Sequence, residues 1–153
     1  MSIRGPLHHI DVSVGDPRRS IPFYTAFFRA LGYKRLRIDH AGFTGEQPTR
    51  AAWRIRYPGG TAFGIEVRSA RPESRQKTHD RYAPGLHHMA FHAESRAAVD
   101  EIHAAVREAG GEVLDAPTDY TGQAGYSSGY YAVFFADPDG VKLEVAYVPD
   151  PNP

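Results

Sequence analysis

The chain has 153 residues and contains no cysteine. This absence excludes disulfide bonds, thiolate metal ligands and a cysteine nucleophile. An excess of charge of either sign is also missing, because 18 basic residues balance 18 acidic ones. A neutral chain without a basic stripe is a poor match for nucleic acid or for an anionic membrane surface. We therefore expect neither as a partner, and expect a small-molecule substrate instead.

Long apolar runs are absent as well. No stretch of the sequence approaches the roughly 18 consecutive apolar residues that a membrane-spanning helix needs. The first residues, Met1 to Pro6, lack the apolar core of a signal peptide. Together with the lack of cysteine, these features predict a cytoplasmic protein. A hydrophobic content of 41% is that of an ordinary globular domain.

What the chain does contain is an internal repeat. Residues 7–14, with the sequence LHHIDVSV, return as LHHMAFHA at residues 86–93. Each half also ends in an apolar-Glu-Val segment, centred on Glu66 in the first half and on Glu144 in the second. A duplication of this kind determines the fold, because each copy must form the same unit. It also suggests the chemistry, since histidine and glutamate are metal-ligand residue types.

The first half predicts one strand, one helix and three further strands. Asp16 and Pro17 signal the start of the helix, and Gly32 signals its end. Pro22 lies inside the apolar pattern and lacks an amide donor, so the regular helix either begins near Ser20 or kinks. The predicted strands of this half lie near residues 7–14, 33–39, 51–57 and 61–68.

The second half repeats this order. Ser95 is the expected N-cap of its helix, and Gly110 ends that helix. The predicted strands lie near residues 86–93, 112–115, 129–136 and 141–148. The loop 116–128 is either a mobile lid or an ordinary surface loop. We expect two modules within one structural domain, divided as residues 1–68, a linker 69–84, residues 85–148 and a tail 149–153.

Alternation along the strands places four side chains on equivalent faces. Side chains of a strand point to opposite faces in turn. His9, Glu66, His88 and Glu144 all alternate with apolar residues and therefore point away from the apolar, helix-covered side. A pseudo-twofold axis between the copies would bring these equivalent positions together. The alternative is that the four side chains are simply solvated residues on polar strand faces.

Three stretches of the sequence resemble the vicinal oxygen chelate superfamily, the group of glyoxalases, bleomycin resistance proteins and dioxygenases. They are residues 9–24, residues 85–91 and residues 130–145, and the last is the most specific. The resemblance implies an α+β fold of two tandem βαβββ modules that form a curved mixed sheet around a metal-binding cleft. It implies one divalent metal, with the ligand positions at His9, Glu66, His88 and Glu144. It also implies a homodimer, although relatives pair their modules either within one chain or between subunits.

The set His, Glu, His, Glu is similar to that of glyoxalase I. Two imidazoles and two carboxylates can hold Ni, Co, Zn, Mn or Fe(II) and leave room for substrate oxygens. The resemblance therefore implies a lyase or isomerase in which the metal is a Lewis acid on a substrate oxygen. Glu66 and Glu144 are the candidate bases that would move a proton on the adjacent carbon.

Other branches of the superfamily remain open. Extradiol dioxygenases would use His9, His88 and Glu144, but Phe134 replaces their tyrosine, and residues 125–127 lack their upstream histidine. Fosfomycin-type thiol transferases use two histidines and one glutamate, which leaves Glu66 surplus. Epimerase relatives carry glutamine at that position. A further alternative is a metal-free, drug-binding protein of the bleomycin-resistance type.

Four more residues are candidates for substrate binding. Tyr130 and Tyr131 begin a strand next to that of Glu144, and alternation puts one of them on the cleft side. Arg56 would suit an anionic substrate if it faces the cleft. His92 shares the face of His88. The alternatives are cross-strand packing for the tyrosines and solvation for Arg56 and His92. His8 and His87 have the opposite parity, which favours packing or structural hydrogen bonds.

Overall fold

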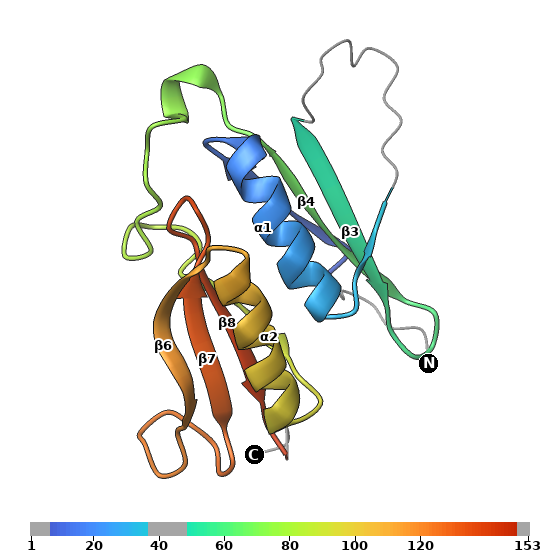
Figure 1. Ribbon diagram of the computed structural model, residues 1–153, viewed down its shortest axis with the longest axis vertical. Helices are drawn as coiled ribbons and strands as arrows, with labels where there is room; N and C mark the ends of the chain where they lie inside the picture. The colour runs from blue at the N-terminus through green and yellow to red at the C-terminus, as the bar shows by residue number, and fades with distance from the viewer. Residues whose placement is uncertain (1–6, 37–48, 150–153) are drawn as a thin grey trace. The chain divides into compact units, whose positions relative to one another are not determined.

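The computed structural model describes residues 7–36 and 49–149. The chain divides into two compact units, residues 1–77 (unit 1) and residues 78–153 (unit 2), and the boundary falls inside the predicted linker. Figure 1 shows that each unit is a four-stranded sheet with one helix on one face. The α+β fold of two tandem βαβββ modules is thus confirmed. Among the residues described, no helix is long and apolar enough to cross a membrane.

Unit 1 contains strand β1 (His9–Val14), helix α1 (Pro17–Ala30) and strands β2 (Lys34–Arg35), β3 (Arg50–Arg56) and β4 (Ala62–Ser69). The strand order is β1-β4-β3-β2, and the first and last strands of the repeat, β1 and β4, are parallel neighbours. The last part of the predicted strand 33–39 lies outside the described residues. A short 3-10 helix, η1 (Pro72–Ser74), follows β4.

Unit 2 has the same plan, with strand β5 (His88–His92), helix α2 (Arg96–Glu108) and strands β6 (Glu112–Asp119), β7 (Tyr131–Ala136) and β8 (Lys142–Tyr147). The order β5-β8-β7-β6 repeats that of unit 1. The predicted strand 112–115 was too short, because β6 continues to Asp119 with two register shifts against β7. The first part of the predicted loop 116–128 therefore belongs to the sheet.

Both helices begin and end as their sequences predict. Asp16 caps α1 through a 3.0 Å hydrogen bond from the Arg18 amide, and Ser95 caps α2 in the same way through Ala98. Gly32 and Gly110 follow the two helices with φ near +80°, a conformation that glycine adopts without strain. Helix α1 starts at Pro17 and includes Pro22, so of the two alternatives offered for Pro22, a start of the regular helix near Ser20 was wrong.

The helix-facing cores of the two units differ in composition. In unit 1, Tyr24 and Phe28 of α1 pack against Trp53 of β3, and the Phe28 and Trp53 ring centroids are 5.2 Å apart. In unit 2, the buried face of α2 is aliphatic and consists of Val99, Ile102 and Val106. These cores fix the helix side of each sheet, so residues of the opposite parity lie on the other face.

Candidate functional site

Strand register places the predicted ligands of each unit on neighbouring parallel strands. His9 lies opposite Gly64 and Asp11 opposite Glu66, so His9 and Glu66 are diagonal neighbours across β1 and β4. In unit 2, His88 lies opposite Lys142 and Ala90 opposite Glu144, which is the same diagonal arrangement across β5 and β8. The two units therefore reproduce one geometry on the sheet face that the helix does not cover.

In unit 2 the two predicted ligands are in contact. The His88 Nε2 atom lies 3.2 Å from the Glu144 Oε2 atom, and Glu144 is only 4% exposed. The phenol of Tyr130 donates a hydrogen bond to the other carboxylate oxygen, Oε1. The Nδ1 atom of His88 lies 2.7 Å from Nδ1 of His87, which leaves Nε2 on the side of Glu144. An imidazole nitrogen and a carboxylate oxygen thus stand side by side, as two ligands of one metal ion would.

Aromatic rings cover the same face of unit 2. We call the group of Tyr120, Tyr126, Tyr130 and Phe134 the aromatic cluster. Tyr126 stacks on Tyr120 with ring centroids 4.7 Å apart, and Phe134 meets Tyr120 edge-on at 5.7 Å. Tyr120 and Phe134 are each 6% exposed, and Ala132 and Ala146 complete this small core. Glu144 is therefore shielded from water by the rings and alanines of its own sheet face.

Two phenols of the cluster are held in the protonated form. Burial raises the pKa of Tyr130, and the hydrogen bond to Glu144 raises it further. Burial likewise raises the pKa of Tyr120, whose phenol donates a hydrogen bond to Asp115. Tyr130 and Tyr120 are hydrogen-bond donors at neutral pH, as an ordinary phenol is, and the raised pKa values extend this to more alkaline pH.

In unit 1 the equivalent carboxylate is engaged by arginines. The Arg50 Nη2 atom donates to Glu66 Oε2 at 2.6 Å, and the Arg68 Nη2 atom donates to Glu66 Oε1 at 2.8 Å. Arg68 also lies 3.2 Å from Asp11. Burial acts to raise the pKa of Glu66, but the hydrogen bonds from Arg50 and Arg68 outweigh it, and the pKa is lowered. Glu66 is therefore a weaker base and a carboxylate whose charge is already compensated.

Each unit supplies one histidine and one glutamate at the predicted ligand positions. Within residues 7–36 and 49–149 no group of three or more histidine or carboxylate side chains forms a metal site by itself. His9 and Glu66 belong to unit 1, whereas His88 and Glu144 belong to unit 2. The convergence of all four on one ion therefore stays a prediction.

A family model covers both of the tandem units. Residues 6–145 match the model of the Glyoxalase/Bleomycin resistance protein/Dioxygenase superfamily. The chain belongs to this superfamily. The uncharacterized protein YqjT of Bacillus subtilis (strain 168) is 31% identical over 139 residues, which are 91% of this chain and 96% of YqjT.

Solved structures of the superfamily have the same fold. A candidate glyoxalase from Bacillus halodurans matches with a TM-score of 0.71 and 26% identity, and the match covers 95% of this chain and 97% of that one. A glyoxalase/bleomycin resistance protein from Albidiferax ferrireducens T118 matches with a TM-score of 0.61 and 24% identity, over 94% and 98% of the two chains. The second likeness shows the fold alone.

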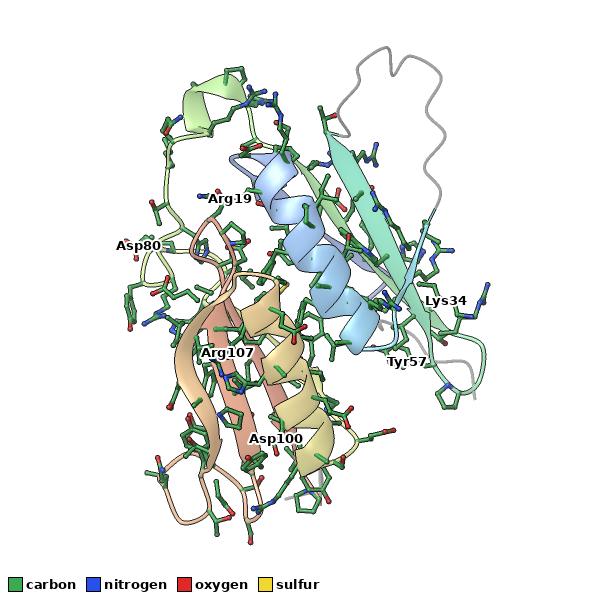
Figure 2. All side chains as sticks on the ribbon, in the orientation of Figure 1. Arg19, Lys34, Tyr57, Asp80, Asp100 and Arg107 are labelled. Atoms are coloured by element: carbon green, nitrogen blue, oxygen red, sulfur yellow. The ribbon has the colours of Figure 1, made fainter. Side chains whose placement is uncertain are left out.

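The predicted substrate-binding residues divide between the two sheet faces. Tyr130 shares the face of Glu144, whereas Tyr131 lies on the helix side, where its phenol donates a 2.8 Å hydrogen bond to Asp100 of α2. Asp100 is labelled in Figure 2. Tyr131 is therefore left out of the proposed site. Arg56 lies opposite Ala62 and shares the sheet face of Glu66. His92 lies opposite Ala146 and shares the sheet face of Glu144. Both side chains are exposed.

Sequence reasoning missed several partners of the two glutamates. The β3–β4 register places Arg50 opposite Arg68, on the same face as Glu66 and diagonal to it. The contact between Arg50 and Glu66 can therefore be predicted only when that register is known. The parity of Arg68 with Glu66 was visible, but not the ion pair. Tyr120 and Tyr126 fell in a segment expected to be a loop. His8 and His87 are exposed, and each hydrogen-bonds to the next histidine; His87 also meets the Tyr82 ring edge-on at 5.8 Å between centroids.

Proposed function

We propose that this protein is a metal-dependent enzyme of the lyase or isomerase type that acts on small molecules with two neighbouring oxygen atoms. The observation that carries the proposal is the contact between His88 Nε2 and Glu144 Oε2 at 3.2 Å, inside a chain of this superfamily. The donor set fits a divalent cation, because nitrogen and carboxylate ligands suit Zn, Ni, Co, Mn and Fe. His9, and Glu66 if it leaves its arginines, would complete the site.

The residues of the proposed site have different roles. A bound metal would supply Lewis acidity at a substrate oxygen. His88 and Glu144 would hold it, and the aromatic cluster would exclude water from Glu144. Glu144 is the better candidate for a proton-transferring base, because the arginines that lower the pKa of Glu66 make that carboxylate a weaker proton acceptor.

A second candidate function is binding of a small apolar molecule without a metal. Two observations favour it. The carboxylate of Glu66 already carries hydrogen bonds from Arg50 and Arg68, which compete with any cation. Tyr126 and Tyr130 of the aromatic cluster are only partly buried, and such rings are the kind of group on which a flat apolar molecule stacks.

Metal content separates the two candidates. The test is mass spectrometry on untagged protein purified without chelator, beside a His88→Ala, Glu144→Ala double variant. About one divalent metal per chain, lost in the double variant, supports the enzyme. Absence of metal after purification and after reconstitution would overturn it and favour the metal-free binder. A Glu66→Gln variant shows whether the site has three or four protein ligands, because a three-ligand site keeps its metal.

Substrate assays follow from the metal. Nickel, cobalt or zinc directs them to proton exchange at carbon next to a carbonyl, and iron directs them to oxygen uptake with a catechol.

The homodimer is also a proposal. Light scattering on the purified chain tests it, and a single-chain mass of 16.9 kDa would contradict it.

A further inference from the structure

The two oxygens of Glu144 have different partners. Oε1 accepts the phenol hydrogen of Tyr130, and Oε2 faces His88 Nε2. We propose that Tyr130 is a positioning residue, which fixes the Glu144 carboxylate so that a single oxygen is presented beside His88 to a metal ion. This inference rests on the proposed function and assigns to one residue the geometry of that site.

Small side chains make this contact possible. Tyr130 immediately precedes β7 and stands four residues before Phe134, which lies directly opposite Glu144. Four strand residues span roughly 13 Å, so the phenol and the carboxyl must reach toward each other along the sheet. The pair between them is Ala132 opposite Ala146, and both are buried. Methyl side chains leave the space in which the phenol meets the carboxylate.

Tyr130 is itself held in place. Its ring meets Tyr126 at 4.9 Å and Tyr120 at 6.5 Å between centroids, both edge-on. Its backbone carbonyl accepts a 2.8 Å hydrogen bond from the Tyr120 amide, and its amide donates to the Ser127 carbonyl at 3.2 Å. The phenol therefore needs no rearrangement to reach Glu144, and the cost of ordering it is met by packing within unit 2.

The hydrogen bond has a defined effect on the carboxylate. A carboxylate without such a partner rotates and exchanges its two oxygens between one-oxygen and two-oxygen binding. A donor fixed on Oε1 removes this freedom and leaves Oε2 for the cation. Partners of this kind commonly change metal affinity by about 10–100-fold when they are removed.

The test compares Tyr130→Phe with a matched control, Tyr131→Phe. The two variants remove one phenol oxygen from neighbouring residues, but the Tyr131 phenol lies on the helix side and bonds Asp100 and not Glu144. The probe is Co²⁺ added to the metal-free full chain, followed by calorimetry and by the visible absorption of bound cobalt. We expect Tyr130→Phe to weaken Co²⁺ binding by about 10–100-fold and to alter the cobalt spectrum. Tyr131→Phe keeps the wild-type affinity and spectrum.

The outcomes separate this inference from the proposed function. If the wild type binds Co²⁺ and Tyr130→Phe binds it with the same affinity and spectrum, the positioning role is wrong and the metal site stands. If the wild type binds no Co²⁺, both are wrong. Equal weakening in the two variants also rejects the positioning role, because the effect then does not depend on the hydrogen bond to Glu144.

A second measurement uses the wild-type chain and therefore tests the proposal even if the Tyr130→Phe variant does not fold. The phenol carbons of the nine tyrosines of the wild-type chain are labelled with ¹³C and assigned by triple-resonance NMR. Addition of a diamagnetic cation, Zn²⁺, then shifts the Tyr130 signal more than that of Tyr120 if Tyr130 shares Glu144 with the metal. An unmoved Tyr130 signal in metal-loaded protein overturns the proposal.

Discussion

Units 1 and 2 share one backbone plan but treat the same glutamate in opposite ways. Glu66 is surrounded by Arg50, Arg68 and, through Arg68, Asp11. The register assigns alanines to all three equivalent positions around Glu144 in unit 2: Ala132, Ala146 and Ala90. One copy thus neutralises its carboxylate, whereas the other leaves it with a phenol and an imidazole. Duplication fixed where the glutamates stand, and the neighbouring side chains decided what each can bind.

The largest expected effect comes from giving unit 2 the arginine of unit 1. Ala146→Arg places a guanidinium where Arg68 stands beside Glu66. We expect the new side chain to pair with Glu144 and to lower metal affinity by about 100-fold, the upper range for changes beside a ligand. Ala146 is 5% exposed, so overpacking should also cost about 1–3 kcal/mol of the free energy of unfolding. Calorimetric metal titration and chemical denaturation measure the two effects.

The control for this variant is Ala104→Arg, which adds the same group at an exposed position of α2. It should leave both quantities near their wild-type values. Unchanged metal affinity in Ala146→Arg would mean that arginine pairing does not exclude a cation. Glu66 would then be as good a candidate ligand as Glu144.

A smaller effect is expected from the ion pairs of Glu66 in unit 1. Because its pKa is lowered by Arg50 and Arg68, Glu66 contributes stability that is present above the pKa of the unfolded chain, about 4.3. This stability is lost as the pH falls through the lower, folded-state pKa. Wild type should therefore be more stable than Glu66→Gln at pH 7, and the gap should close on acidification. Arg68 is 44% and Arg50 33% exposed, so solvent screening keeps the gap below about 1 kcal/mol.

Denaturant unfolding of both proteins at a series of pH values measures this gap. Glu101→Gln removes the same charge from an exposed position of α2 and serves as the control. A gap that grows toward low pH would contradict the assignment of a lowered pKa to Glu66.

The smallest effect concerns the exposed ion pair between Arg96 and Asp119 in unit 2. Asp119 has its pKa lowered to about 2, first by hydrogen bonds from Thr121 and then by Arg96. Arg96→Ala and Thr121→Ala should each raise this pKa only partway toward the usual range, because the amide of residue 121 still donates to Asp119 in both variants. Any stability linked to Asp119 is present above its unfolded-state pKa and lost as the pH falls toward 2. Carboxyl ¹³C NMR titration reports the pKa directly, and an unchanged pKa in either variant would contradict the contribution assigned to that side chain.

The repeat made most of the fold predictable from the sequence. The start of the first strand, Leu-His-His, recurs 79 residues later, and alternation then assigns His88 and Glu144 to the face away from the helix, where the structure has them. Strand β6 was harder, because Pro117 and the polar residues around it are typical of a loop. As the edge strand of its sheet, β6 tolerates a proline, since one side of it needs no ladder hydrogen bonds.

The surroundings of the two glutamates could not be predicted in the same way. They depend on which residues of β3 and β7 stand opposite β4 and β8, and register is a property of the whole sheet. Pro22 illustrates a second limit. Its missing amide would remove one helical hydrogen bond, to the Arg18 carbonyl, but tertiary packing of the aromatic face of α1 outweighs that loss.

The separate cores have a practical consequence for spectroscopy. Trp53, the one tryptophan of the chain, is buried against α1 in unit 1, whereas the stacked phenols of the aromatic cluster belong to unit 2. Fluorescence excited at the red edge of indole absorption follows unit 1 alone. Near-ultraviolet circular dichroism in the tyrosine band is weighted toward unit 2. One unlabelled sample therefore shows whether the two copies of the repeat melt together or one before the other.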